Sequence, residues 1–170
     1  ERADFDVLRK PLFTALDLGY GGGPYRMTIL VPADGVSIAQ LVGALDADGW
    51  RTWMQGFQTE NTTISIPKYR LEYEVTLNEV LAAMGMDAAF DASRADFSRL
   101  VRSGGWISEV KQKTFIDVNE EGTEAAAVTS VAIIESMPVP IVVDRPFVVA
   151  IRERLSGTLL FLGAIVDPSS

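Results

Sequence analysis

The most constraining stretch of this 170-residue chain is a run of small residues that follows an acidic turn. Residues 119–122 form the turn, and the small residues then extend from Thr123 to Ser130 without proline. Side chains alternate between the two faces of an extended strand, so one face here would carry neither bulk nor charge. We therefore expect this stretch to be able to enter a sheet. The residues on that face are Thr123, Ala125, Ala127 and Thr129.

The composition is that of an ordinary globular chain, with 48% hydrophobic and 22% charged residues. A chain of this length supports one core, so we predict a single domain over residues 1–170. The net charge of -8 opposes binding to nucleic acid or to an anionic membrane, because both ligands are negatively charged. No apolar run reaches about 18 residues, and we expect no membrane-spanning helix.

The chain contains neither cysteine nor histidine. Cysteine proteases, Ser-His-Asp hydrolases and nearly all zinc sites each require one of these residues, so we predict that the protein is not an enzyme. Asp46 and Asp48 lack the other ligands of a calcium loop, and Ser136 lacks an evident base. We expect no catalytic residues, metal or cofactor.

The first third of the chain predicts three strands, at Asp6–Leu8, Phe13–Leu18 and Tyr25–Val31. The third strand is apolar enough to be buried on both faces. Residues 19–24 predict a hairpin turn. A phosphate-binding loop is excluded there because Pro24 breaks the glycine spacing and no helix follows.

Two capping boxes predict helix starts, one at Ser37–Gln40 and one at Thr76–Glu79, the second helix ending at Gly85. Residues 50–54 predict a further helical turn, whose two tryptophans we expect in the core.

The remaining strands are expected at 62–66, 69–75, 106–118, 141–143, 147–151 and 159–166, and we expect the last three to be buried. The class is therefore α+β, with mainly antiparallel sheets and a few short helices.

Four segments together resemble the serpin family, over essentially the whole chain. Residues 113–127 are close to the family's hinge signature, and Asp144–Phe147 resembles the start of its carboxyl end. Residues 157–168 and 66–86 also match. We identify the chain by this resemblance as the carboxyl-terminal half of a serpin, with its hinge and reactive loop at about 119–140.

The resemblance implies a suicide-substrate inhibitor of a serine protease. The protease would cleave the loop and be held as an acyl-enzyme while the loop inserts as a new strand. The residues assigned to the hinge are Glu120, Glu121, Gly122, Thr123, Glu124, Ala125, Ala126 and Ala127.

Two counts place the cleaved bond one residue apart. The count from Pro146 gives Glu135–Ser136, which we prefer, and the count from Gly122 gives Ser136–Met137. Ile133 and Ile134 would fill apolar subsites. These residues suggest an elastase-like, subtilisin-like or glutamate-preferring protease, with a cysteine protease as a further possibility.

Two departures from the family pattern bear on this reading. Most members have a histidine where this chain has Gln112, and the amino-terminal half of the fold is missing from this sequence. An inserted loop would need that half as a second neighbour. The alternative is a non-inhibitory serpin-fold protein with a binding or chaperone-like role. The resemblance favours an extracellular location, and a cytoplasmic one is the alternative.

Overall fold

The computed structural model describes residues 2–20, 22–118 and 139–168, which fall into two compact units. Unit 1 takes in residues 1–69 and 118–170, and unit 2 takes in residues 70–117. The prediction of a single domain stays a prediction. Mainly antiparallel sheets with short helices confirm the predicted α+β class.

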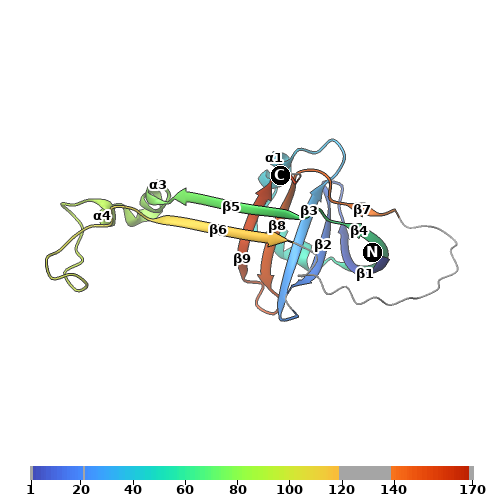
Figure 1. Cartoon of the computed structure of the whole chain (residues 1–170), viewed down its shortest axis with the longest axis horizontal. Coiled ribbons are helices and arrows are strands. Elements are labelled where there is room, and N and C mark those ends of the chain that lie inside the picture. Colours follow the sequence, from blue (N-terminus) through green and yellow to red (C-terminus); the bar gives the residue numbers. More distant parts are fainter. Residues whose placement is uncertain (1, 21, 119–138, 169–170) are drawn as a thin grey trace. The chain divides into compact units, whose positions relative to one another are not determined.

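Unit 1 is built on a seven-stranded sheet in the order β7-β4-β1-β2-β3-β8-β9 (Figure 1). Neighbours pair antiparallel except β4 and β7, which run parallel. The strands are β1 (Arg2–Arg9), β2 (Phe13–Tyr20), β3 (Tyr25–Pro32), β4 (Gln58–Ser65), β7 (Ile141–Val142), β8 (Phe147–Glu153) and β9 (Leu159–Ile165).

The first three strands form a meander. Tyr20 pairs with Tyr25 across the β2–β3 turn, which confirms the predicted hairpin. β3 is buried at every position from Met27 to Pro32, and since successive side chains point to opposite faces, this confirms the expectation that both of its faces are covered.

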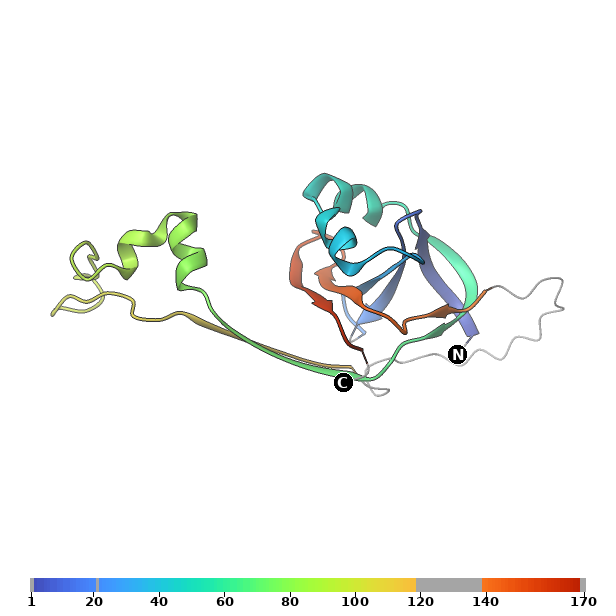
Figure 2. The same ribbon diagram turned by 90° about the horizontal axis from the view of Figure 1, so that it is seen from above.

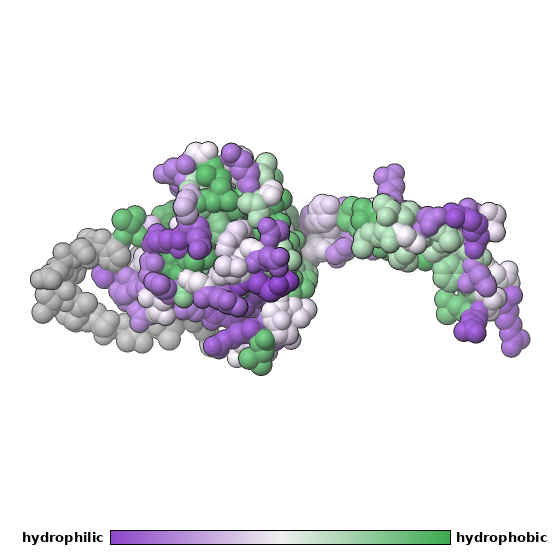
Figure 3. All heavy atoms as spheres, turned by 180° about the vertical axis from the view of Figure 1, so that it is seen from behind, coloured by the Kyte–Doolittle hydropathy of each residue, from purple (hydrophilic) through white to green (hydrophobic). Residues whose placement is uncertain are grey.

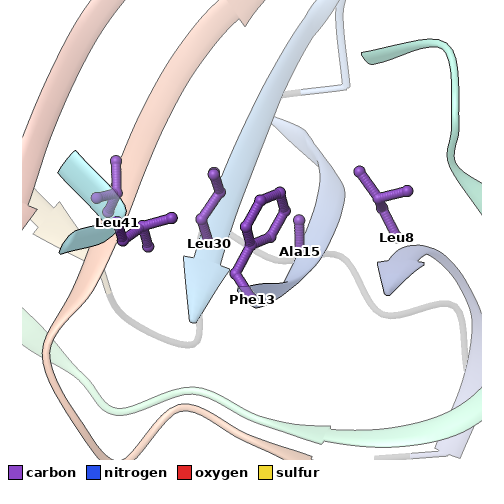
Figure 4. Close-up of a cluster of buried hydrophobic side chains, with 6 residues drawn as sticks. Leu8, Phe13, Ala15, Leu30 and Leu41 are labelled. Carbon is purple, nitrogen blue, oxygen red and sulfur yellow. The ribbon is translucent and has the colours of Figure 1, made fainter. Parts of the chain in front are cut away.

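Two helices in unit 1, α1 (Ile38–Gly43) and α2 (Ala47–Met54), lie to one side of the sheet (Figure 2). Ser37 forms the predicted capping box, in which its hydroxyl accepts from the Gln40 amide at 3.2 Å. Trp53 lies edge-on to Phe13, with ring centroids 4.7 Å apart. The helices thus cover a cluster of buried side chains that Figure 4 shows, namely Leu8, Phe13, Ala15, Leu30, Leu41 and Val148.

A charged network crosses four strands of the same sheet. The Asp17 carboxylate accepts from Arg152 Nη2 at 2.7 Å and from Arg26 Nε at 2.8 Å. Thr28 Oγ1 donates to the other carboxylate oxygen of Asp17 at 2.6 Å. Arg26 also donates to the Asp6 carboxylate. Asp17 and Arg152 are only 6% and 7% exposed, so both charges depend on these partners.

Unit 2 contains β5 (Tyr69–Thr76) and β6 (Lys111–Val118), which pair with each other and run in opposite directions (Figure 1). Between them the chain forms α3 (Asn78–Leu81), a π-helical turn η1 (Ala82–Met86) and α4 (Asp87–Phe90). Gly85 has φ +100°, and the helix kinks there. The first helical segment therefore ends at Gly85, as predicted, and a further short segment with α4 follows directly.

The capping box predicted at Thr76 does not form, and this prediction was wrong. Leu77 occupies the cap position, and no side chain caps the helix. Asn78 instead accepts from the Val110 amide at 2.8 Å and donates to the Ser108 carbonyl at 2.9 Å. These bonds engage the Ser108 carbonyl and the Val110 amide, which precede β6, with a side chain. The predicted strand 106–118 therefore begins only at Lys111.

The expectation that all three closing strands are buried was only partly correct. β8 is buried along nearly its whole length. β9 exposes four successive large side chains, 41–55% each, because it lies at the edge of the described sheet. These side chains are Leu159, Leu160, Phe161 and Leu162.

We expect Asp17→Asn to lower the free energy of unfolding by about 3 kcal/mol, because it leaves the buried Arg152 guanidinium without a counter-charge. Urea unfolding followed by circular dichroism measures the change. The matched control is Glu60→Gln, which breaks the exposed pair with Arg9 and should cost less than about 1 kcal/mol. Equal losses of unfolding free energy in the two variants would contradict the claim that the buried network stabilises unit 1 more than an exposed ion pair does.

Candidate reactive loop and its flanks

The residues predicted for the hinge, the subsites and the cleaved bond lie outside the described residues. They are Glu120, Glu121, Gly122, Thr123, Glu124, Ala125, Ala126, Ala127, Ile133, Ile134, Glu135, Ser136 and Met137. The structure describes the chain on both sides of them, up to Val118 and again from Val139. The candidate site is therefore built from these two flanks.

The amino-terminal flank is β6, which is held to β5 by side chains as well as by the ladder. Glu74 of β5 pairs with Lys113 at 2.7 Å and Lys111 at 3.4 Å. The Arg70 guanidinium lies over the Phe115 ring, 4.9 Å from its centroid. All of these charges are largely exposed, so each contact contributes little energy and mainly sets how the two strands align.

One edge of β6 carries no partner strand among the residues that the structure describes, since β6 pairs with β5 alone. An open edge offers a row of N–H and C=O groups to which another strand can pair. Gln112 is exposed on this strand. The edge is a suitable neighbour for an added strand.

The carboxyl-terminal flank is β7, which lies parallel to β4. Ile141 pairs with Ile64 and Val142 with Ser65, and the Val143 amide donates to the Ser65 carbonyl at 2.8 Å. Ile141 and Val143 are buried, at 6% and 2% exposure. This flank is thus anchored in unit 1 by both its backbone and its side chains.

Arg145 secures the turn between β7 and β8. Its guanidinium pairs with Asp34, in the loop after β3, and with Asp144 at 3.1 Å. The hydrogen bonds that Arg145 donates to Asp34 and Asp144 raise the pKa of Arg145, so it stays charged. The turn that leads into β8 is therefore tied to the loop after β3.

A further contact was not predicted from the sequence. The Thr62 hydroxyl, on β4, donates to the Val139 carbonyl at 3.3 Å, and Thr62 is fully buried. A threonine in a strand is common, and nothing in its neighbours indicated that its side chain would reach the loop's flank. Only the parallel register of β4 and β7 brings the two residues together.

A cavity of about 680 Å³, also not predicted, opens between α2 and the β8–β9 hairpin. Apolar side chains and arginines share its lining, among them Trp50, Met54, Arg152, Arg154 and Leu162. The two tryptophans of α2 were predicted as core residues, and both pack against the core cluster.

The described residues show no group of three or more acidic side chains that could hold a metal ion. In the same part of the chain, no helix is both long and apolar enough to span a membrane.

Comparison with known proteins decides the family. The family model described as "Serpin (serine protease inhibitor)" matches residues 1–168. The chain belongs to the serpin family. Serpins are generally protease inhibitors rather than enzymes, and the prediction that the chain is a serpin is confirmed.

Three similar proteins illustrate the match. Plasminogen activator inhibitor 1 of Neovison vison is 34% identical over 168 residues, which are 97% of this chain and 42% of that protein. The structure of mouse protein-Z dependent protease inhibitor is 30% identical, with a TM-score of 0.82, and the match covers 99% of this chain and 44% of that one. Thyroxine-binding globulin complexed with thyroxine is 26% identical, with a TM-score of 0.83 and 100% and 46% covered.

The chain therefore spans less than half the length of the relatives that it matches. Its fold is a partial serpin fold, as the resemblance predicted.

Proposed function

We propose that this chain is the carboxyl-terminal part of an inhibitory serpin that traps a serine protease as an acyl-enzyme. The observation that carries the proposal is the difference between the two flanks of the loop. The carboxyl-terminal flank is anchored on β4, whereas the amino-terminal flank continues a strand with an open edge. A cut between them frees the amino-terminal side to add to that edge.

The free energy of insertion is sufficient for this role. Residues 123–136 number 14, and each new backbone hydrogen bond contributes about 1 kcal/mol net, on the order of 10 kcal/mol in total. A whole folded protease is stabilised by roughly 5 to 15 kcal/mol. Insertion can therefore distort a protease that is still attached to the loop.

The inserted strand needs a neighbour on each side, and β6 supplies one. We propose that the other belongs to the amino-terminal half of the fold, which the longer relatives have and this sequence lacks. The exposed β9 supports the same view, since a long apolar edge strand without charges is normally covered. Figure 3 shows hydrophobic surface along the β9 side of unit 1.

The protein to test is the completed chain, by which we mean a chimera with the amino-terminal part of plasminogen activator inhibitor 1 placed before residue 1.

We expect the completed chain to form a complex that survives boiling in detergent with an elastase-like, subtilisin-like or glutamate-preferring protease. A denaturing gel detects the complex, and amino-terminal sequencing of the released peptide locates the cut. The peptide should begin at Ser136. A start at Met137 would move the reactive bond to Ser136–Met137, and clean cleavage with no complex would overturn the inhibitory proposal.

We expect Thr123→Arg in the completed chain to raise the stoichiometry of inhibition at least about tenfold, because insertion would bury an unpaired charge. Ala127→Pro should act similarly by removing a ladder donor. The matched control is Glu124→Arg, because strand alternation would place position 124 on the opposite face of the inserted strand, and the natural residue there is already charged. Unchanged stoichiometry in both Thr123→Arg and Ala127→Pro would count against insertion.

We expect Leu160→Asp to affect the two forms of the protein differently. In the 170-residue chain Leu160 is 49% exposed, and the substitution should cost less than about 1 kcal/mol. In the completed chain it would bury an unpaired carboxylate and should cost about 3 kcal/mol or more. Urea unfolding measures both, and equal costs would contradict the covering of β9.

The second candidate is a serpin-fold protein that binds a ligand or partner, or acts like a chaperone, without inhibiting. The cavity beside α2 favours it, since apolar walls with arginines suit an amphipathic anion. Thyroxine-binding globulin, which has a similar structure, is named for binding thyroxine. Loop cleavage without a covalent complex would move the assignment to this candidate.

A further inference from the structure

The backbone ladder that anchors β7 is short. β7 has two residues, Ile141 and Val142, and it lies at the edge of the sheet with β4 as its neighbour. The chain before them reads Pro138-Val139-Pro140. Within sheets proline is confined largely to edge strands, and Pro140 lies directly before this edge strand.

Thr62 extends the anchor beyond the point where the backbone ladder stops. In the parallel register Ile64 is opposite Ile141, so Thr62 is opposite Val139, two residues earlier on each strand. The Thr62 backbone belongs to the β1–β4 ladder, where it pairs with Ala3, and its hydroxyl donates to the Val139 carbonyl at 3.3 Å. A side chain therefore adds a hydrogen bond beyond the two residues of the backbone ladder.

The two residues of this contact differ in their surroundings. Thr62 is fully buried, so its hydroxyl depends on the bond to Val139. The Val139 side chain is 75% exposed. The contact holds the carbonyl of Val139 against β4 and leaves its side chain accessible to a docking protein.

We propose that Thr62 is a positioning residue that fixes the carboxyl-terminal flank of the reactive loop on β4. This inference rests on the proposed function. Val139 is the fourth residue after the Glu135–Ser136 bond, so the contact sets where the anchored part of the loop begins. It leaves only Ser136, Met137 and Pro138 between the preferred bond and the anchor. After cleavage, the carboxyl-terminal fragment stays on β4 while the amino-terminal side departs.

The test is amide hydrogen exchange of the 170-residue chain, read at Ile141, Val142 and Val143. Thr62→Val has nearly the same shape as threonine and lacks the hydroxyl, and we expect it to speed exchange at these amides about fivefold, the effect of one net hydrogen bond. Thr62→Ser keeps the hydroxyl and should leave exchange near the natural rate. Thr63→Val removes the neighbouring hydroxyl, which points to the other face of β4. This variant should also leave exchange near the natural rate.

Two results would overturn the proposal. Unchanged exchange in Thr62→Val would show that the β4–β7 ladder holds the flank without the hydroxyl. Equal acceleration in Thr63→Val would show a general loosening of β4. Exchange at the β1–β2 amides serves as the internal reference for folding of the sheet. The measurement needs no protease, so it is separate from a failure of the completed chain to form a covalent complex.

Discussion

The pairing of β3 with β8 is the contact on which unit 1 depends. It joins residues 25–30 to residues 148–153, which lie on opposite sides of the candidate loop in the sequence. Closing so long a segment costs conformational entropy, and the cost is offset by two strands that are buried along most of their length. The salt bridge between Asp17 and Arg152 reinforces the same junction, because it links β2 to β8 across β3.

Under the proposed mechanism, this junction would hold the sheet together when the loop is cut. β8 is held between β3 and β9, and the turn before it is tied down through Arg145. β7 then needs only a short ladder and the Thr62 contact to stay in register with β4. The carboxyl-terminal side of the loop therefore keeps its place through contacts that do not involve the loop itself. Among the described residues, the amino-terminal side is held through β6, which has β5 as its one partner strand, and the proposed loop insertion depends on this difference.

β9 and the neighbouring cavity are parts of unit 1 that the described residues leave uncovered. Four successive large apolar residues at a sheet edge, without lysine or proline to protect them, are a site for pairing with another strand. The short β7 at the opposite edge follows Pro138 and Pro140 and offers little to pair with. The β9 edge is thus long and apolar, whereas the β7 edge is short and flanked by proline. Relatives more than twice as long as this chain have further residues that could cover the β9 edge.

The sequence by itself determined the local elements and the family. The Ser37 capping box, the β2–β3 hairpin and the buried β3 follow from short-range patterns, in which the interacting residues are close along the chain. Only the tertiary structure decided which groups met over long distances. Asn78 bonds to Val110 rather than leaving Thr76 to cap the helix, and Thr62 reaches Val139 across 77 positions. Such contacts depend on strand order and register, because a side chain bonds to whichever partner the sheet places beside it.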